Sequence, residues 1–152
     1  MKKNPKICFV SSSGGHWEQL QKLKPLADKY EGFFVTEKTQ FDAPLASYFM
    51  MQTDLKDKLM PFKMLVNSVK ALKIWIKEKP DLIISCGAAV AVPFFYIGKM
   101  MGAKLVYIEV FDRIDKPTMT GKMVYPVVDK FVVQWEEQKK VYPKAVNLGS
   151  IF

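Results

Sequence analysis

His16 is the residue of this sequence best suited to acid–base chemistry. It is the only histidine, and imidazole is the side chain that titrates nearest neutral pH. It follows Ser13, Gly14 and Gly15, and a serine–glycine loop that leads into a helix exposes backbone N–H groups to a phosphate or diphosphate. We expect these four residues to bind such a group, with His16 accepting a proton from a hydroxyl or donating a hydrogen bond to a phosphate. A tight turn with a helix-capping histidine is the structural alternative.

Further candidates follow two later apolar runs. Glu109 comes directly after 105–108 and is the leading carboxylate, able to orient a sugar hydroxyl or to act as a base. Arg113 offers planar donors to an anion, although it could instead pair with Asp112. The dinucleotide and P-loop fingerprints are absent. The remaining expected contacts to a phosphate-bearing ligand are Gly87, Ala88, Phe111, Asp112 and Arg113.

The pattern of apolar runs predicts the elements that position these residues. The runs are nearly continuous rather than alternating, which is typical of strands buried on both faces of a parallel sheet. Helices are expected between them, at 17–30 and 62–79, so the fold class is α/β, a Rossmann-like doubly wound parallel sheet. Ligands bind such sheets at the carboxyl ends of the strands, where the candidate loops lie. The expected strands are 7–10, 32–35, 82–85, 105–108 and 131–133, with shorter ones at 47–52 and 145–148.

Length and composition limit the function classes. A chain of 152 residues fits one domain, 1–152. Its net charge of +8 comes from lysines and a single arginine, Arg113. Sequence-specific nucleic-acid readers rely on several arginine forks, so an anionic lipid surface is favoured over nucleic acid. With one histidine, a metal site is not expected, and no cofactor is predicted. Cys8 and Cys86 lie in apolar runs and are expected to be reduced core residues.

Two segments bear on membranes. The uncharged stretch 82–98 approaches bilayer-spanning length, but Gly87 and Pro93 interrupt it, so a strand, a turn and a buried helix are expected. In 62–79 the expected core stripe is Phe62, Leu65, Val66, Val69, Leu72 and Ile76. Basic residues beside outlying apolar ones suit a helix on an anionic membrane, although an ordinary charged face is the alternative. The expected membrane contacts are Lys63, Met64, Lys70, Ile74, Trp75 and Lys77.

Four segments together carry a resemblance to a known family. They are 12–16, 79–87, 107–113 and 120–135, the last reading TGKMVYPVVDKFVVQW. The sequence resembles the oligosaccharide-biosynthesis family that contains the membrane-recruiting subunit of the dolichol-linked UDP-GlcNAc transferase and bacterial capsule and exopolysaccharide accessory subunits. It is more distantly similar to the N-terminal half of the peptidoglycan lipid-linked GlcNAc transferase.

The resemblance implies the N-terminal half of a GT-B glycosyltransferase. That half meets a polyprenyl-diphosphate-linked acceptor, and a nucleotide-sugar-binding glycosyltransferase subunit supplies the UDP-sugar from a separate chain. The chain ends about where fused enzymes pass into their second half, which agrees with this division. Carried over to this sequence, the first loop is Gly14, Gly15 and His16, the second contains Gly87, and Glu109 is the acidic residue after the next strand.

Two departures from the family qualify these expectations. The eukaryotic subunits typically begin with a membrane-spanning segment, which this sequence lacks, so a cytoplasmic, peripheral location on the inner face of the cell membrane is expected. The second loop reads Cys86–Gly87–Ala88–Ala89, where fused enzymes have paired glycines. A non-catalytic scaffold that recruits a complete glycosyltransferase, and a stand-alone nucleotide-binding domain, are the competing hypotheses.

Overall fold

The computed structural model describes residues 3–54 and 56–152, and its centre is a parallel sheet of seven strands. The strand order is β3-β2-β1-β4-β5-β6-β7, which reverses direction between β1 and β4. This is the doubly wound arrangement that the apolar runs predict, and each strand lies at a predicted run. The strands are β1 (Lys6–Val10), β2 (Glu31–Glu37), β3 (Ala46–Met50), β4 (Leu82–Ser85), β5 (Lys104–Ile108), β6 (Lys130–Val133) and β7 (Val146–Asn147).

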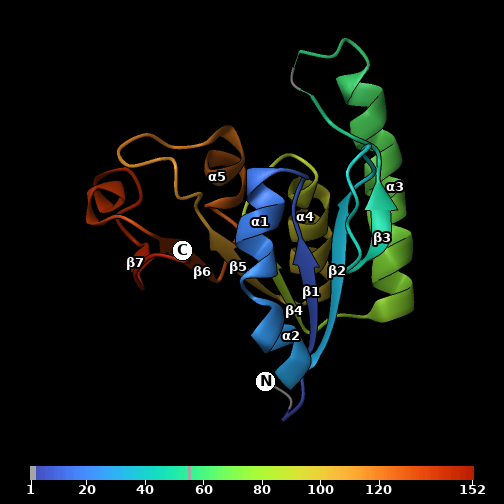
Figure 1. The fold of residues 1–152 in the computed structure, drawn as a ribbon, viewed down its shortest axis with the longest axis horizontal. Helices are drawn as coiled ribbons and strands as arrows, with labels where there is room; N and C mark the ends of the chain where they lie inside the picture. Colours follow the sequence, from blue (N-terminus) through green and yellow to red (C-terminus); the bar gives the residue numbers. More distant parts are fainter. Residues whose placement is uncertain (1–2, 55) are drawn as a thin grey trace.

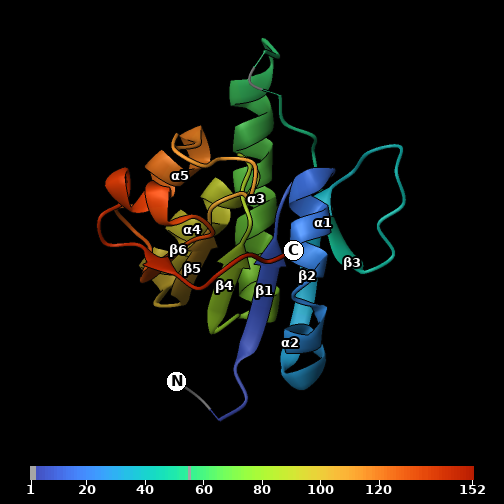
Figure 2. The same ribbon diagram turned by 60° about the vertical axis from the view of Figure 1, so that its left-hand side comes forward.

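Helices cover both faces of the sheet (Figures 1 and 2). On one face lie α1 (Gly15–Gln21) and α2 (Lys24–Lys29), and on the other lie α3 (Met60–Glu78), α4 (Ala91–Met101) and α5 (Met119–Val124). A 3₁₀ helix, η1, spans Glu136–Lys140. The predicted helix 17–30 is therefore two helices. Pro25 explains the break, because its ring would collide with the Gln21 carbonyl of a continuous helix and it has no N–H to donate there.

The uncharged stretch 82–98 forms β4, a turn and the buried start of α4, as predicted. Pro93 lies in the first turn of α4, where a missing N–H costs no helical hydrogen bond. Within the described residues, no helix combines the length and the apolarity that crossing a bilayer requires.

The core consists of two apolar clusters, one on each side of the sheet. The larger includes Tyr107, Phe131 and Tyr142, and the smaller includes Phe9, Trp17 and Phe34. Cys8 and Cys86 are buried free thiols, as predicted. Burial raises the pKa of the Cys86 thiol to about 12, so this thiol is inert at neutral pH.

The register of the parallel strands brings the functional loops to one edge. Val10 pairs with Val35 on one side and with Ser85 on the other, and Ser85 pairs with Tyr107. The carboxyl ends of β1, β2, β4 and β5 are therefore level. The loops that follow these strands share one rim of the molecule, where they can surround a single ligand.

Candidate functional site

A cavity of about 760 Å³ opens at the carboxyl edge of the sheet. Its wall has two chemical characters. One part is polar and includes Ser13, His16 and Arg113, and the other is apolar and consists of Met60, Met64, Val92, Met119 and Met123. Such a cavity suits an amphiphilic ligand, because flexible methionine side chains adapt to an apolar chain while the polar groups fix a headgroup.

His16 lies in the first turn of α1 and lines this cavity. Its Nδ1 is 2.9 Å from the backbone oxygen of Cys86. A carbonyl can only accept a hydrogen bond, so Nδ1 carries the proton, and the neutral ring has an unprotonated Nε2. That nitrogen is free to accept a proton from a ligand hydroxyl. The predicted chemistry at His16 is therefore compatible with its geometry.

Gly87 permits this position of His16. Its φ of +116° favours glycine, and an added Cβ would lie 2.7 Å from Nδ1 of His16. Its N–H donates to Ser85 Oγ at 3.0 Å. Ala88 also has a positive φ, +74°, which is unusual for a residue with a Cβ, and it lines the cavity. The turn after β4 is thus shaped around the imidazole.

The first loop holds the other predicted binding residues. Gly14 has a φ of +72°, and Ser13 lines the cavity beside His16. A Cβ added to Gly14 or Gly15 would meet no atom within 4 Å, so the backbone here is open to a ligand. The expected contact of these residues with a diphosphate stays a prediction.

The loop that follows β5, residues 109–113, is the third loop, and its side chains divide between two cavities. Arg113 lines the main cavity, whereas Phe111 and Asp112 line a neighbouring one of about 390 Å³. His16 borders both. Phe111 is held by two hydrogen bonds, because its N–H donates to Gln19 Oε1 at 3.2 Å and its oxygen accepts from Trp135 Nε1 at 2.7 Å. No ion pair between Asp112 and Arg113 occurs in the described chain, so Arg113 is available to an anion.

Glu109 is fully buried and does not line the main cavity. Its carboxylate accepts hydrogen bonds from Tyr142 Oη at 2.8 Å, from Thr118 Oγ1 at 2.9 Å and from the N–H of Val110 at 3.1 Å. Burial, followed by the charge of Glu109, raises the pKa of Tyr142. We infer that Glu109 holds the segment from β5 to α5 in place, and no cavity contact supports its predicted catalytic role.

Gly121 in α5 leaves room for the carboxylate of Glu109 and the hydroxyl of Tyr142 to meet. A Cβ there would lie 2.4 Å from both Glu109 Oε2 and Tyr142 Oη. Thr118 is the N-cap of α5, and its Oγ1 accepts from the N–H of Gly121 at 2.9 Å. The sequence reasoning did not predict α5, although the T-x-x-G spacing contains its cap.

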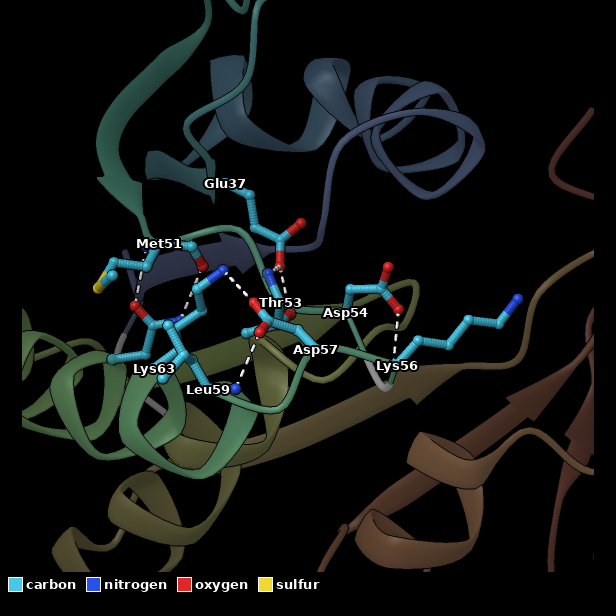
Figure 3. A network of polar contacts seen from close by, with 9 residues as sticks. Glu37, Met51, Thr53, Asp54, Lys56, Asp57, Leu59 and Lys63 are labelled. Atoms are coloured by element: carbon cyan, nitrogen blue, oxygen red, sulfur yellow. Dashed lines mark hydrogen bonds and ion pairs between the residues drawn. The ribbon is translucent and has the colours of Figure 1, made fainter.

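The residue that sequence reasoning missed is Glu37, at the carboxyl end of β2. It is 4% exposed and lines the main cavity. Its Oε1 accepts from the N–H of Thr53 at 2.9 Å and from Thr53 Oγ1 (Figure 3). Burial raises the pKa of Glu37, while the hydrogen bonds from Thr53 oppose that shift. The rule that selected the other loops, a polar residue directly after a strand, would have found it.

The buried face of α3 corrects an expectation from the sequence. Ile74 is buried, and Met64 and Trp75 pack against the core, although all three were expected at a membrane. Asn67 shares the buried face. Its Oδ1 accepts from the N–H of Met51 and its Nδ2 donates to the Met51 oxygen, both at 2.9 Å. The prediction was wrong because α3 buries the face that fits the neighbouring segment around Met51, and this is not its most apolar face.

The outer face of α3 carries the residues predicted for the core. We call Phe62, Leu65, Val69, Leu72 and Ile76 the outer stripe, and all five are exposed, Leu65 by 64%. At 100° per residue, Lys63, Lys70, Lys73 and Lys77 lie along one flank of the stripe. Lys63 pairs with Asp57 at 2.5 Å, and Nζ of Lys77 lies 5.3 Å from the centre of the Tyr48 ring. Membrane contact by the predicted Lys63, Lys70 and Lys77 stays a prediction.

No metal centre is apparent in the part of the chain that the structure describes, because no three His, Cys, Asp or Glu side chains gather closely enough.

Comparison with known families shows which family the chain belongs to. A model of the family described as "Oligosaccharide biosynthesis protein Alg14 like" matches residues 56–151. The chain belongs to the Alg14-like family. The match contains α3, the second and third loops and Glu109, so the family resemblance carried by the sequence motifs is confirmed.

Curated relatives of this Alg14-like chain are subunits of a transferase. The human "UDP-N-acetylglucosamine transferase subunit ALG14" is 35% identical over 81 residues, which are 49% of this chain and 38% of the human protein. The corresponding subunit of Yarrowia lipolytica is 25% identical over 177 aligned positions, covering 96% of this chain and 81% of that protein. The chain thus spans well under half of the human relative.

Solved structures confirm the fold class. MurG of Acinetobacter baumannii matches with a TM-score of 0.72 at 16% identity, over 88% of this chain and 42% of MurG. The UDP-N-acetylglucosamine 2-epimerase of Rickettsia bellii matches with a TM-score of 0.76 at 14% identity, over 97% of this chain and 45% of that chain. The Alg14-like chain therefore has the fold of one half of a GT-B protein.

Proposed function

We propose that this chain is the acceptor-binding and membrane-recruiting subunit of a two-chain UDP-sugar glycosyltransferase. The partner is a nucleotide-sugar-binding chain, and the acceptor is a sugar linked to a polyprenyl diphosphate. The observation that carries the proposal is the main cavity, in which a free Nε2 of His16 and the cation of Arg113 share one space with a methionine-lined wall. Family membership and the names of the relatives support the division of labour.

The cavity offers partners for the three parts of such an acceptor, which are its diphosphate, its isoprenoid chain and its sugar hydroxyl. Arg113 and Lys56 can neutralise a diphosphate, and charge-assisted hydrogen bonds favour the guanidinium. The methionines offer an apolar surface to the first isoprene units. His16 then faces the hydroxyl that is to be glycosylated, and Nε2 takes its proton as the new bond forms.

The test is reconstitution with the two chains together. UDP-N-acetylglucosamine is the first donor to try, because the curated relatives are named for it. We expect transfer to a polyprenyl-diphosphate sugar by the pair and almost none by either chain alone. The substitution His16→Ala should lower kcat by about 10² to 10⁴ while the complex still forms. Full activity of the partner alone would support the scaffold hypothesis instead and overturn this proposal.

Recruitment to an anionic membrane is assigned to the outer stripe of α3 rather than to the side chains first expected there. Its apolar residues can enter the lipid boundary while the flanking lysines meet anionic headgroups. Lys70 and Lys73 have no ion pair among the described residues, so their charge is available. Met60 and Met64 of the same helix line the main cavity, so the cavity adjoins the helix that would lie on the lipid.

Vesicle flotation tests this surface. The wild-type chain should float with phosphatidylglycerol vesicles and much less with phosphatidylcholine vesicles. Replacing Leu65 and Val69 by aspartate should lower binding by about tenfold or more, since two apolar contacts of about 1 to 2 kcal/mol each are lost. Leu148→Asp is the matched control, because Leu148 is 71% exposed but lies outside α3. Equal loss in the control would overturn the assignment.

The pathway and location complete the proposal. We assign the enzyme to capsule or exopolysaccharide biosynthesis at the cytoplasmic face of the cell membrane, as the motif resemblance implies. Deletion of the gene should abolish a surface polysaccharide and leave other lipid-linked products unchanged. An unaltered polysaccharide profile would contradict this part alone.

A further inference from the structure

We propose that Glu37 is the carboxylate that works with His16 in activating the acceptor, by stabilising the positive charge that the imidazole gains when it takes the hydroxyl proton. The inference rests on the proposed function. It replaces the predicted role of Glu109 with a residue that reaches the same cavity as His16.

The position of Glu37 is fixed by the fold. It is the last residue of β2, and the register puts the end of β2 beside the end of β1, from which the His16 loop departs. Its Oε1 is held by two donors of one residue, Thr53. Figure 3 shows the carboxylate turned toward Thr53, with its second oxygen free of the other residues drawn. The N–H of Ser13 also acts on this carboxylate, from the loop that carries His16.

Anchoring the Thr53 segment does not by itself require a charge. A glutamine would accept the same two hydrogen bonds through its Oε1, without the cost of burying a carboxylate. A buried charge at the wall of a cavity is typical of functional sites, where it opposes a charge that appears during the reaction. Glu37 and His16 line the same cavity, and a positive charge on His16 would lower the pKa of Glu37.

The reaction balances with these two residues and the UDP-sugar that the partner supplies. The acceptor O–H bond breaks and its proton passes to Nε2 of His16, which becomes an imidazolium beside Glu37. The acceptor oxygen forms a bond to the anomeric carbon of the donor sugar. The bond from that carbon to the diphosphate oxygen breaks, and UDP leaves with the electron pair. Glu37 exchanges no proton and acts through His16, so it is a positioning residue.

Glu37→Gln in the two-chain enzyme tests the inference. Since the amide keeps the hydrogen bonds to Thr53 and removes only the charge, we expect an unchanged acceptor KM and a kcat lower by about 10²-fold. Glu37→Asp keeps the charge and should recover part of the rate, and it provides a second variant if the amide folds poorly. Glu31→Gln is the matched control, the same substitution at the exposed opposite end of β2.

A double-mutant cycle with His16→Ala separates the two possible roles. If Glu37 acts through His16, then Glu37→Gln changes kcat by less than about threefold once His16 is gone, because residues that act as a unit are strongly non-additive. Independent losses that multiply, or a single Glu37→Gln variant with wild-type kcat, would overturn the inference while leaving the proposed function intact. No transfer by the wild-type pair would overturn the proposed function, and this inference with it.

Discussion

Two buried carboxylates, Glu37 and Glu109, lie at the carboxyl edge of the same sheet, and they differ in how many hydrogen bonds they accept. Glu109 follows β5 and accepts hydrogen bonds from Tyr142, Thr118 and Val110. Glu37 ends β2, and Thr53 donates two hydrogen bonds to one of its carboxylate oxygens. Glu109 lies outside the main cavity, whereas Glu37 lines it. A strand-end carboxylate is therefore a candidate for chemistry when part of its bonding capacity still faces a cavity.

The largest expected effect is the loss of stability on substitution of Glu109. Glu109→Ala removes the acceptor of the buried Tyr142 hydroxyl and of the half-buried Thr118 hydroxyl, and each buried group left unpaired costs about 1 to 3 kcal/mol. We expect the free energy of unfolding to fall by about 3 kcal/mol or more, measured by chemical denaturation. Glu37→Ala should cost about 1 kcal/mol, because fewer donors lose a partner. Equal losses in the two variants would remove the contrast between the two carboxylates.

An intermediate effect on stability and activity is expected at Gly87, which positions His16 at the main cavity. Gly87→Ala combines a strained φ with a Cβ that would displace His16, so stability should fall by about 1 to 3 kcal/mol and transfer should fall as well. Gly102→Ala is the control, because Gly102 has a φ of +83° and no atom within 4 Å of an added Cβ. It should lose stability and keep activity. Activity that survives in Gly87→Ala would contradict the role of the imidazole position.

The smallest effect is a dependence of stability on pH. Burial raises the pKa of Glu37 in the folded state above its unfolded value, so folding binds its proton more tightly. The stability from this group is therefore present below the unfolded pKa of about 4.3 and is lost as pH rises through the folded pKa. The unfolding free energy of wild type minus that of Glu37→Gln should decrease across this window. A difference that is constant or increases with pH would contradict the assignment.

The strands and the doubly wound fold class could be predicted because runs such as Ile7 to Val10 are apolar on both faces, which is typical of a parallel sheet covered on both sides. The loops at the carboxyl edge followed from the same rule. The position of His16 could not be predicted in detail, because it depends on the Cys86 carbonyl, which is distant in sequence. The roles of Glu109 and Glu37 likewise depended on partners such as Tyr142 and Thr53.

The faces of α3 show where apolar periodicity fails. The outer stripe has the regular spacing of a core face, but the helix buries Asn67 and Ala71 instead. Asn67 is buried because both polar atoms of its amide bond to the backbone of Met51, just beyond the edge strand β3. Nothing in the local sequence reveals that such a partner exists, so the most apolar face was assigned to the core.

The double hydrogen bond of Asn67 also gives the molecule a mechanical linkage. Met51 is two residues from Thr53, and Thr53 donates hydrogen bonds to Glu37. The long outer helix and the wall of the cavity are therefore joined by a short stretch of backbone (Figure 3). A tilt or slide of α3 would act on that stretch as well as on Glu78, which accepts a hydrogen bond from Tyr48 of β3 and pairs with Lys6 of β1. Whatever settles against the outside of this helix is thereby in a position to adjust the geometry at the reactive end of the cavity.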